Sequence, residues 1–308
     1  MKQNPARRKL IKAAAAASLA PFLIPGRVLA SEHLIAQRPI HSSGEMLPVI
    51  GLGTYQSFGV GSSASERDPL RDVLRRFTGK GGSVIDSSPM YGRSEGVVGD
   101  LSAELSLRPR LFMATKVWTS GREAGIEQMN QSFRRMRVDV MDLMQIHNLV
   151  DMHTHTKTLE QWKESGRIRY TGFTHYHAGA HDDLERIMKQ RAFDFTQFNY
   201  SLVEREAEQR LLPTAMDTGT AVIINRPFAA GRLFSRTRGA DLPDWAAEFD
   251  CSSWAQFFLK YIVSHPAVTC AIPATSKPKH MADNMMGGYG TLPDEAMRKR
   301  MRKLIDSL

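Results

Sequence analysis

The sequence predicts an α/β fold, a (β/α)8 barrel or TIM barrel, because eight short apolar runs alternate with segments of helical periodicity along its 308 residues. A barrel of this kind typically takes about 250 residues, so the chain is long enough for one. Several of the apolar runs end on a single polar residue, and the carboxyl ends of barrel strands meet at one rim. We therefore expect residues 31–308 to form a single barrel domain with its functional site at that rim.

The first thirty residues indicate an export signal. Paired Arg7-Arg8 precede a weakly apolar, Ala-rich run over residues 13–24, and Val28-Leu29-Ala30 has the small residues of a cleavable site. Twin arginines are typical of the pathway that exports folded proteins. We expect residues 1–30 to be a twin-arginine signal peptide that engages the Tat export machinery of a bacterium, and the mature protein to be periplasmic. A membrane anchor and a basic tail are the alternatives, but spanning a bilayer takes about 20 apolar residues.

The rest of the chain is nearly balanced in charge. The predicted signal holds six of the 41 Lys and Arg and none of the 32 acids, so the remainder carries +3 of the total +9. It contains no Lys/Arg tract interleaved with aromatics, and we expect no nucleic-acid partner. No later apolar run is long enough to span a membrane. No exposed apolar stripe is evident either, and for this reason a monomer is expected. Whether Cys251 and Cys270 pair stays open, although the apolar run around Cys270 favours a buried free thiol.

The barrel domain begins with an N-terminal β-hairpin, predicted from the turn residues Ser43-Gly44. The eight barrel strands are predicted from short apolar runs at 49–53, 82–86, 111–116, 140–147, 168–172, 193–197, 221–224 and 268–272. Helices are predicted at 69–77, from 94, around 126–136, and at 180–189, 204–217 and 254–264, with part of a further helix at 159–166 and two more helices closing the chain. The last of these should bury Met297, Met301, Leu304 and Leu308 on one face. The polar stretch 228–250 is predicted to be a long loop over the rim.

A doubly wound open sheet is the main alternative architecture. It would require a glycine-rich dinucleotide-binding turn after the first strand. The segment Gly51-Leu52-Gly53-Thr54-Tyr55-Gln56 has only two of the three glycines of that turn. The barrel therefore explains the pattern better.

Polar residues of complementary chemistry follow three neighbouring strands. Asp86 ends the second strand, Tyr91 lies in the turn five residues later, and Lys116 and His147 end the third and fourth strands. A lysine beside a tyrosine favours the phenolate, and a carboxylate keeps that lysine fixed and charged. Such a phenol can pass a proton to a carbonyl oxygen that is receiving a hydride, while the histidine orients the same oxygen. Asp86, Tyr91, Lys116 and His147 are therefore the predicted catalytic residues.

Taken together, these segments resemble the aldo-keto reductase family. The resemblance is carried by residues 51–54, 86–92, 114–116, 143–147, 164–172 and 272–278, and it covers most of the chain after the predicted signal. It implies a (β/α)8 barrel that uses NADPH to reduce an aldehyde or ketone to an alcohol, with Tyr91 as the acid.

The resemblance also implies where the cofactor binds, although several positions depart from the family pattern. Thr174-His175 replace a Ser-Asn pair, Asn225-Arg226-Pro227 replace a stacking aromatic, and Ala274 and His280 replace a Lys and an Arg near the adenosine phosphate, so NADH stays an alternative to NADPH. The predicted cofactor-binding residues are Gly53, Thr54, Thr174, His175, Gln197, Asn225, Arg226, Pro227, Ser276, Lys277, His280 and Asn284. The predicted substrate pocket is lined by Tyr55, Phe58 and Trp118, with core packing as the equal alternative for Phe58.

Six of the ten histidines fall between residues 147 and 181. His153-x-His155 and His175-x-His177 are expected on rim loops, and this spacing suits a transition metal. No convergent carboxylates accompany them, so solvated loop histidines are the preferred interpretation and no metal site is predicted. A metal-binding barrel and an exported, non-catalytic nucleotide-binding or regulatory protein are the alternatives to a carbonyl reductase.

Overall fold

The computed structural model describes residues 34–190 and 193–308, and the predicted signal peptide lies outside them. Eight parallel strands follow one another around the barrel in chain order: β3 (Leu52–Gly53), β4 (Val84–Asp86), β5 (Phe112–Val117), β6 (Met141–His147), β7 (Ile168–Thr174), β8 (Phe195–Asn199), β9 (Ala221–Asn225) and β10 (Cys270–Ala271). Parallel bridges pair Ile50 with Ala271 and Gly53 with Ala274, which brings the last strand back beside the first. The predicted barrel is confirmed.

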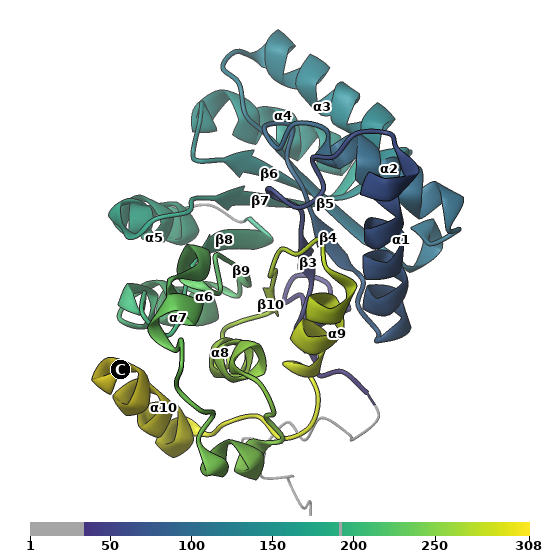
Figure 1. Cartoon of the computed structure of the whole chain (residues 1–308). Helices are drawn as coiled ribbons and strands as arrows, with labels where there is room; N and C mark the ends of the chain where they lie inside the picture. The colour runs from purple at the N-terminus through teal and green to yellow at the C-terminus, as the bar shows by residue number, and fades with distance from the viewer. Residues whose placement is uncertain (1–33, 191–192) are drawn as a thin grey trace, which may run out of the picture.

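Helices surround the strands on the outside of the barrel (Figure 1). They are α1 (Ala64–Gly79), α2 (Ser94–Glu104), α3 (Arg122–Met136), α4 (Met152–Glu164), α5 (His181–Gln190), α6 (Leu211–Thr218), α7 (Arg232–Arg236), α8 (Trp254–Val263), α9 (Pro278–Met286) and α10 (Glu295–Ser307). At least one helix separates each barrel strand from the next, and such crossovers let all eight strands run parallel.

The predicted N-terminal hairpin is also confirmed, as β1 (Gln37–Pro39) paired antiparallel with β2 (Met46–Pro48). Gly44 in its turn has φ 77°, a left-handed conformation that glycine adopts without steric cost. Two hairpin side chains, Ile40 and Leu47, join the cluster that fills the barrel interior. The other members of that cluster are Val84, Phe112, Ala114, Leu143, Tyr170, Phe195, Ala221, Ile223, Cys270 and Ile272. The hairpin thus packs against the amino end of the barrel and leaves the carboxyl end free for polar groups.

A second, larger core lies between the strands and the helices. In α3, for example, Met129, Phe133 and Met136 recur three and four residues apart and are buried, as their spacing predicts. Full burial of such a side chain stabilises the fold by about 1.5–3 kcal/mol. This core holds the helices against the barrel, so the strand ends form a rigid frame for the site.

Several predicted helix boundaries are wrong. Helix α1 begins at Ala64 rather than at Pro69, because Ser63 donates a hydrogen bond to Glu66, whose other oxygen accepts from the Gly61 N–H, and this network anchors an earlier first turn. Helix α6 begins at Leu211 rather than at residue 204, whereas α4, which begins at Met152, contains most of the part predicted at 159–166. The predicted loop 228–250 contains α7 and a short helical segment, Asp244–Phe249.

The buried face of α10 also differs from the prediction. Arg298, Met301 and Ile305 are buried, whereas Leu308 is exposed. Arg298 can occupy a core position because its guanidinium donates to the Tyr200 hydroxyl at 2.8 Å and to Glu208 at 2.7 Å. A pattern of apolar residues alone could not identify this buried ion pair.

Cys251 and Cys270 are both buried and free, which confirms the free thiol expected at Cys270. Burial raises the pKa of the Cys251 thiol to about 11. Among the helices that the structure describes, none combines the length and apolarity needed to cross a membrane.

Candidate active site

Asp86 and Lys116 form a buried ion pair at the carboxyl ends of β4 and β5. Lys116 Nζ lies 2.5 Å from Asp86 Oδ2 and donates a second hydrogen bond, of 2.7 Å, to the backbone carbonyl of Ser87. Burial alone would lower the pKa of Lys116, but Asp86 and Tyr91 outweigh it and raise that pKa above its ordinary value. A charged ammonium is therefore held inside the mouth of the barrel.

Tyr91 lies over this ion pair, in the turn after β4. Lys116 Nζ is 5.1 Å from the centre of the phenol ring. Burial raises the pKa of Tyr91, and the opposing influence of Lys116 is too small to reverse that shift. Lys116 does lower the pKa of Tyr91, as we expected. The net shift of that pKa is nevertheless upward, so the expectation of a favoured phenolate is wrong. The phenol keeps its proton at neutral pH.

His147 ends β6 and faces the same mouth. Its ring centre lies 5.9 Å from that of Tyr91 and 6.3 Å from that of Trp118. Burial and, to a lesser extent, the charge of Lys116 lower the pKa of His147 to about 2, so the imidazole is neutral at physiological pH. The structure thus brings together Asp86, Tyr91, Lys116 and His147, the four side chains that the strand-end argument selected.

A network of buried amides continues from Asp86 across the barrel. Gln145 and Gln197 both donate from Nε2 to Asp86 Oδ1, at 3.0 and 2.9 Å. The Gln197 Nε2 also reaches Gln145 Oε1 at 3.3 Å, while Gln197 Oε1 accepts from Thr174 at 3.2 Å and from Asn225 at 3.4 Å. The side-chain amide of Gln197, one of the predicted cofactor-binding residues, is therefore bonded by the protein at both ends.

Gln145 is the residue of this network that the sequence analysis missed. It lies in the apolar strand β6, two residues before His147, so both side chains point to the same side of the strand. A single amide at that spacing inside an apolar run was the available signal, since buried amides need partners.

Two neighbouring side chains at the end of β9 have hydrogen-bonding atoms without partners. Asn225 Oδ1 and Arg226 Nε are buried and unbonded among the residues that the structure describes. The Asn225 Nδ2 is occupied, because it donates to the backbone carbonyl of His175 at 3.0 Å. An amide oxygen that can accept, beside a guanidinium that can donate, suits a ligand with both a carboxamide and phosphates. This end of the barrel therefore fits a nicotinamide dinucleotide.

The left-handed backbone at Arg226, with φ 51°, places the guanidinium beside the rim. Its central carbon lies 6.0 Å from the ring centre of Tyr176, and Glu204 is 3.8 Å from one of its terminal nitrogens. Pro227 follows and is buried. At this distance Glu204 leaves the Arg226 cation only loosely paired, so it can also attract an anion.

Gly53 and Thr54 lie at the end of β3 and support the backbone of the site. A Cβ at Gly53 would lie 2.6 Å from the carbonyl oxygen of Ile272, so glycine is what allows the β3 and β10 segments to meet. The Thr54 hydroxyl lies 3.0 Å from both the Asp86 carbonyl oxygen and the Ser87 hydroxyl. Both residues therefore fix the turn that carries Asp86.

The remaining predicted cofactor residues lie on and before α9. Ser276, Lys277 and His280 are exposed, whereas Asn284 is buried. Partial burial, followed by the charges of Lys277 and Lys279, lowers the pKa of His280. At neutral pH the positive charge of this segment therefore comes from the two lysines.

Two of the three predicted pocket residues flank the mouth. The ring centre of Tyr55 lies 5.0 Å from that of Tyr91, and both Tyr55 and Trp118 are exposed. Phe58 instead lies fully buried in the larger core, which agrees with the packing alternative. The pocket prediction is therefore wrong for Phe58.

The clustered histidines in the described part of the chain were the candidates for a metal centre. Within residues 34–190 and 193–308, no three His, Cys, Asp or Glu side chains are placed to hold a metal ion. His153 and His155 are not on a rim loop, because they belong to the first turns of α4, where His155 Nε2 lies 2.7 Å from the Thr119 carbonyl oxygen. His175 and His177 pack ring against ring, with centres 4.3 Å apart.

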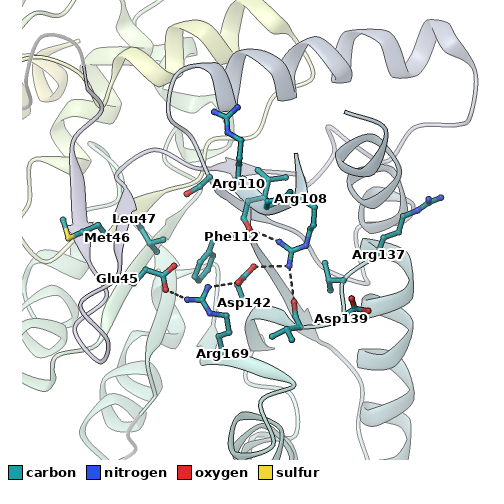
Figure 2. A pocket seen from close by; sticks show the side chains of 15 residues that line it. Glu45, Met46, Leu47, Arg108, Arg110, Phe112, Arg137, Asp139, Asp142 and Arg169 are labelled. Carbon is teal, nitrogen blue, oxygen red and sulfur yellow. Dashed lines mark hydrogen bonds and ion pairs between the residues drawn. The ribbon is translucent and has the colours of Figure 1, made fainter. Parts of the chain in front are cut away.

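A pocket of about 450 Å³ opens at the opposite, amino end of the strands (Figure 2). Arg169 donates to Asp142 at 2.8 Å and also pairs with Glu45. Arg108 donates to the carbonyl oxygens of Leu111 and Val140, at 2.9 and 3.2 Å. These side chains therefore bond to groups of the protein itself, and the amino end of a barrel generally serves stability.

The protein-family comparison agrees with this geometry. The sequence profile of the Aldo/keto reductase family matches residues 49–305. A methylglyoxal reductase of Escherichia coli, YeaE, is 29% identical over 256 residues, which cover 80% of this chain and 88% of the relative. An NADH-specific methylglyoxal reductase of the same organism is 25% identical over 226 residues, covering 63% and 68% of the two chains.

Solved structures show the same fold. An aldo-keto reductase from Klebsiella pneumoniae, solved in complex with NADPH, superposes with a TM-score of 0.75 at 26% identity and covers 88% of this chain and 96% of its own. The family profile spans every strand of the barrel from β3 to β10 and all four clustered strand-end residues. The chain therefore belongs to the aldo/keto reductase family and is an NAD(P)H-dependent oxidoreductase.

Proposed function

We propose that this protein reduces the carbonyl group of an aldehyde or ketone to an alcohol. The observation that carries the proposal is the buried Lys116–Asp86 ion pair beneath the ring of Tyr91, with neutral His147 beside it. When bound, the dinucleotide supplies a hydride to the carbonyl carbon. Tyr91 gives its phenolic proton to the carbonyl oxygen, so one C–H and one O–H bond form, and the tyrosinate then regains a proton from water.

The surroundings of Tyr91 support its role as the acid. Its raised pKa keeps the proton on the phenol until the carbonyl oxygen gains negative charge. Lys116 stabilises the tyrosinate that forms, and Asp86 holds Lys116 in place. His147 lies on the same side of the mouth, where it can orient the carbonyl oxygen.

NADPH is the cofactor that we propose, with NADH as the alternative. The unbonded Asn225 Oδ1 is suited to accept a hydrogen bond from the amino group of the carboxamide, and Gln197 supports Asn225 instead of binding that group itself. Arg226, Lys277 and Lys279 supply positive charge for the phosphates. The relatives include a structure in complex with NADPH and an enzyme named NADH-specific, so both nucleotides need testing.

The substrate that we propose to test first is a small 2-oxoaldehyde such as methylglyoxal. The two Escherichia coli relatives described above have that substrate in their names, and for one of them the match covers 88% of its own length. The exposed rings of Tyr55 and Trp118 flank Tyr91 and His147 and can contact the carbon skeleton of the substrate.

Replacing Tyr91 with Phe tests the reaction directly. The Y91F variant should lose at least about a hundredfold in kcat for carbonyl reduction, since it removes a general acid. Its Kd for NADPH, measured by tryptophan fluorescence, should stay within about twofold of the wild type, because the hydroxyl that is lost does not bind the dinucleotide. Tyr289→Phe is the control, because that hydroxyl bonds to the Lys80 carbonyl oxygen instead. Wild-type turnover in Y91F would contradict the proposal.

We also propose that the mature protein is a periplasmic monomer exported through the twin-arginine pathway. The support is the Arg7-Arg8 pair before the apolar run. Changing both arginines to lysine in the full chain should leave the protein in the cytoplasm, and cell fractionation measures this. Wild-type protein that stays in the cytoplasm would contradict the export proposal, and light scattering of residues 31–308 tests the monomer.

A further inference from the structure

Ser88 contacts the ring of His147 inside the mouth of the barrel. Ser88 Oγ lies 3.0 Å from His147 Nδ1, and both residues are buried. The backbone N–H of Met90 donates to the same Ser88 Oγ at 3.3 Å. The serine hydroxyl is therefore placed between one group that can only donate and one ring nitrogen whose role depends on the tautomer.

The hydrogen-bond inventory decides that role. A serine hydroxyl has one proton to donate and two lone pairs to accept with, and the Met90 N–H occupies one lone pair. Among the described residues, His147 Nδ1 is the acceptor found within hydrogen-bonding distance of the Ser88 hydroxyl. The opposite tautomer, with a proton on Nδ1, would leave the Ser88 proton buried without an acceptor, which costs about 1–3 kcal/mol.

The imidazole of His147 is neutral and carries a single N–H proton, so the tautomer can be assigned. Burial and Lys116 keep the His147 imidazole neutral at working pH, so a proton absent from Nδ1 must be on Nε2. Nε2 makes no hydrogen bond to the described residues, yet it is not one of their fully buried unpaired atoms, so it is accessible from the mouth of the barrel. The N–H of His147 is thus directed to the place where a carbonyl oxygen would accept it.

We propose that Ser88 is a positioning residue that fixes His147 as the Nε2–H tautomer, so that the imidazole donates a hydrogen bond to the substrate carbonyl oxygen. The proposal rests on the carbonyl reduction proposed above. It assigns two tasks to one turn, because the Tyr91 N–H bonds to the Ser88 carbonyl oxygen at 3.0 Å. The turn that carries the proton donor therefore also sets the hydrogen-bonding role of the histidine.

The experiment measures the tautomer without turnover. In protein labelled with ¹⁵N in histidine, long-range ¹H–¹⁵N spectra distinguish a protonated nitrogen from an unprotonated one, and His147→Asn identifies the ring. We expect the wild type to show Nε2 protonated and Nδ1 unprotonated. A wild-type ring protonated on Nδ1, or an equal mixture of both tautomers, would overturn the proposal, and this outcome does not depend on any variant folding.

Variants then connect the tautomer to the reaction. Ser88→Ala should give a mixture of tautomers and lower kcat/KM for carbonyl reduction by about tenfold, as expected when an oriented donor to the reacting oxygen is lost, while the Kd for NADPH stays unchanged. Ser88→Thr keeps the hydroxyl and should restore the wild-type tautomer. The matched control is Ser87→Ala, a neighbouring buried serine whose hydroxyl faces Thr54, and it should leave the His147 spectrum unchanged.

An unchanged His147 spectrum in Ser88→Ala, or the same mixture in Ser87→Ala, would contradict the role of Ser88. The two proposals fail separately. If the wild type shows the Nε2–H tautomer but reduces no carbonyl compound, the reductase proposal fails and the tautomer assignment stands. If Y91F abolishes an existing reduction while the wild type shows Nδ1–H, only the Ser88 proposal fails.

Discussion

Both ends of the barrel carry charged side chains, partly exposed at the amino end and buried at the carboxyl end, and these charges have different partners. At the amino end, Arg169 bonds both Asp142 and Glu45, and Arg108 bonds two backbone carbonyls, as Figure 2 shows. At the carboxyl end, Lys116 and Asp86 pair with each other, while the Tyr91 phenol above them keeps its proton. At the amino end the charged groups bond to other groups of the protein. At the carboxyl end the ion pair lies beside Tyr91 and influences its pKa.

The difference teaches that a pocket is a poorer guide to function than incomplete hydrogen bonding. The amino end has a pocket of about 450 Å³, yet the arginines named above donate hydrogen bonds to protein groups there. At the carboxyl end, Asn225 Oδ1 and Arg226 Nε are buried without partners, and such atoms are uncommon in proteins. Buried atoms that lack partners in the protein suggest a ligand that supplies them.

The largest expected effect is at the carboxyl end. Lys116→Met leaves Asp86 as an uncompensated buried charge and should lower the free energy of unfolding by about 3–5 kcal/mol. It should also lower kcat by at least about a hundredfold, because the charge that stabilises the tyrosinate is lost. Denaturant unfolding and steady-state kinetics measure the two effects.

Lys260→Met is the matched control for that variant. Lys260 is equally buried, but its acceptors among the described residues are the carbonyl oxygens of Tyr289 and Thr291, at 2.5 and 3.0 Å, and its burial lowers its pKa to about 8. The Lys260→Met variant should be less stable than the wild type but should keep the wild-type kcat when it is assayed below its unfolding temperature. Equal losses of kcat in both variants would show that Lys116 acts through stability alone.

A smaller effect is expected at the unbonded acceptor. Asn225→Leu removes the Oδ1 proposed to bind the carboxamide and should raise the Kd for NADPH about fivefold to tenfold, the loss expected for one hydrogen bond. Tryptophan fluorescence titration measures it. Asn199→Leu is the control, because Asn199 pairs with Asn225 in the sheet register but has both amide ends bonded within the protein, to His181 and Glu204. An unchanged Kd in the Asn225 variant would reject this role.

At the amino end, removing a charge should affect stability slightly and turnover not at all. Glu45→Gln weakens the pair with Arg169, and since both side chains are partly exposed the loss should be below about 1 kcal/mol. A loss of that size corresponds to a decrease in Tm of about 2–4 °C, measurable by calorimetry. A decrease in kcat/KM beyond about twofold would mean that the two ends are coupled, contrary to the comparison above.

The smallest expected effect is a flat pH profile. His147, with a pKa near 2, and Tyr91, with a raised pKa, should leave kcat/KM constant between about pH 5 and 9, with activity lost only as Tyr91 deprotonates at higher pH. Stability should behave differently: the neutral buried imidazole favours the fold above pH 6.5, and that contribution is lost as pH falls toward 2, because the unfolded histidine takes up a proton first. A kinetic pKa near 6.5 that disappears in His147→Asn would contradict the neutral ring.

The sequence was most informative where a residue's role depends on strand position. Asp86, Lys116 and His147 each follow an apolar run, and parallel strands of a barrel all end at one rim, so their convergence could be predicted without coordinates. The hairpin was predicted from its turn residues, and its turn needs the left-handed conformation of Gly44. The sequence was less informative for α1 and α4, because their first turns are rich in polar residues and lack apolar periodicity.

Only the tertiary structure decided how the polar groups are partnered. The chain itself determined an eight-stranded barrel, its hairpin and the strand ends that carry the site, because apolar periodicity and turn chemistry are local properties. It could not show that the Gln197 amide is hydrogen-bonded to Asp86 and Thr174, or that Phe58 is buried. Nor could it show that Ser88 bonds to His147, fifty-nine positions away. Burial and hydrogen bonding depend on which distant strands and turns become neighbours, and these same contacts set the pKa values and the tautomer on which the proposed chemistry depends.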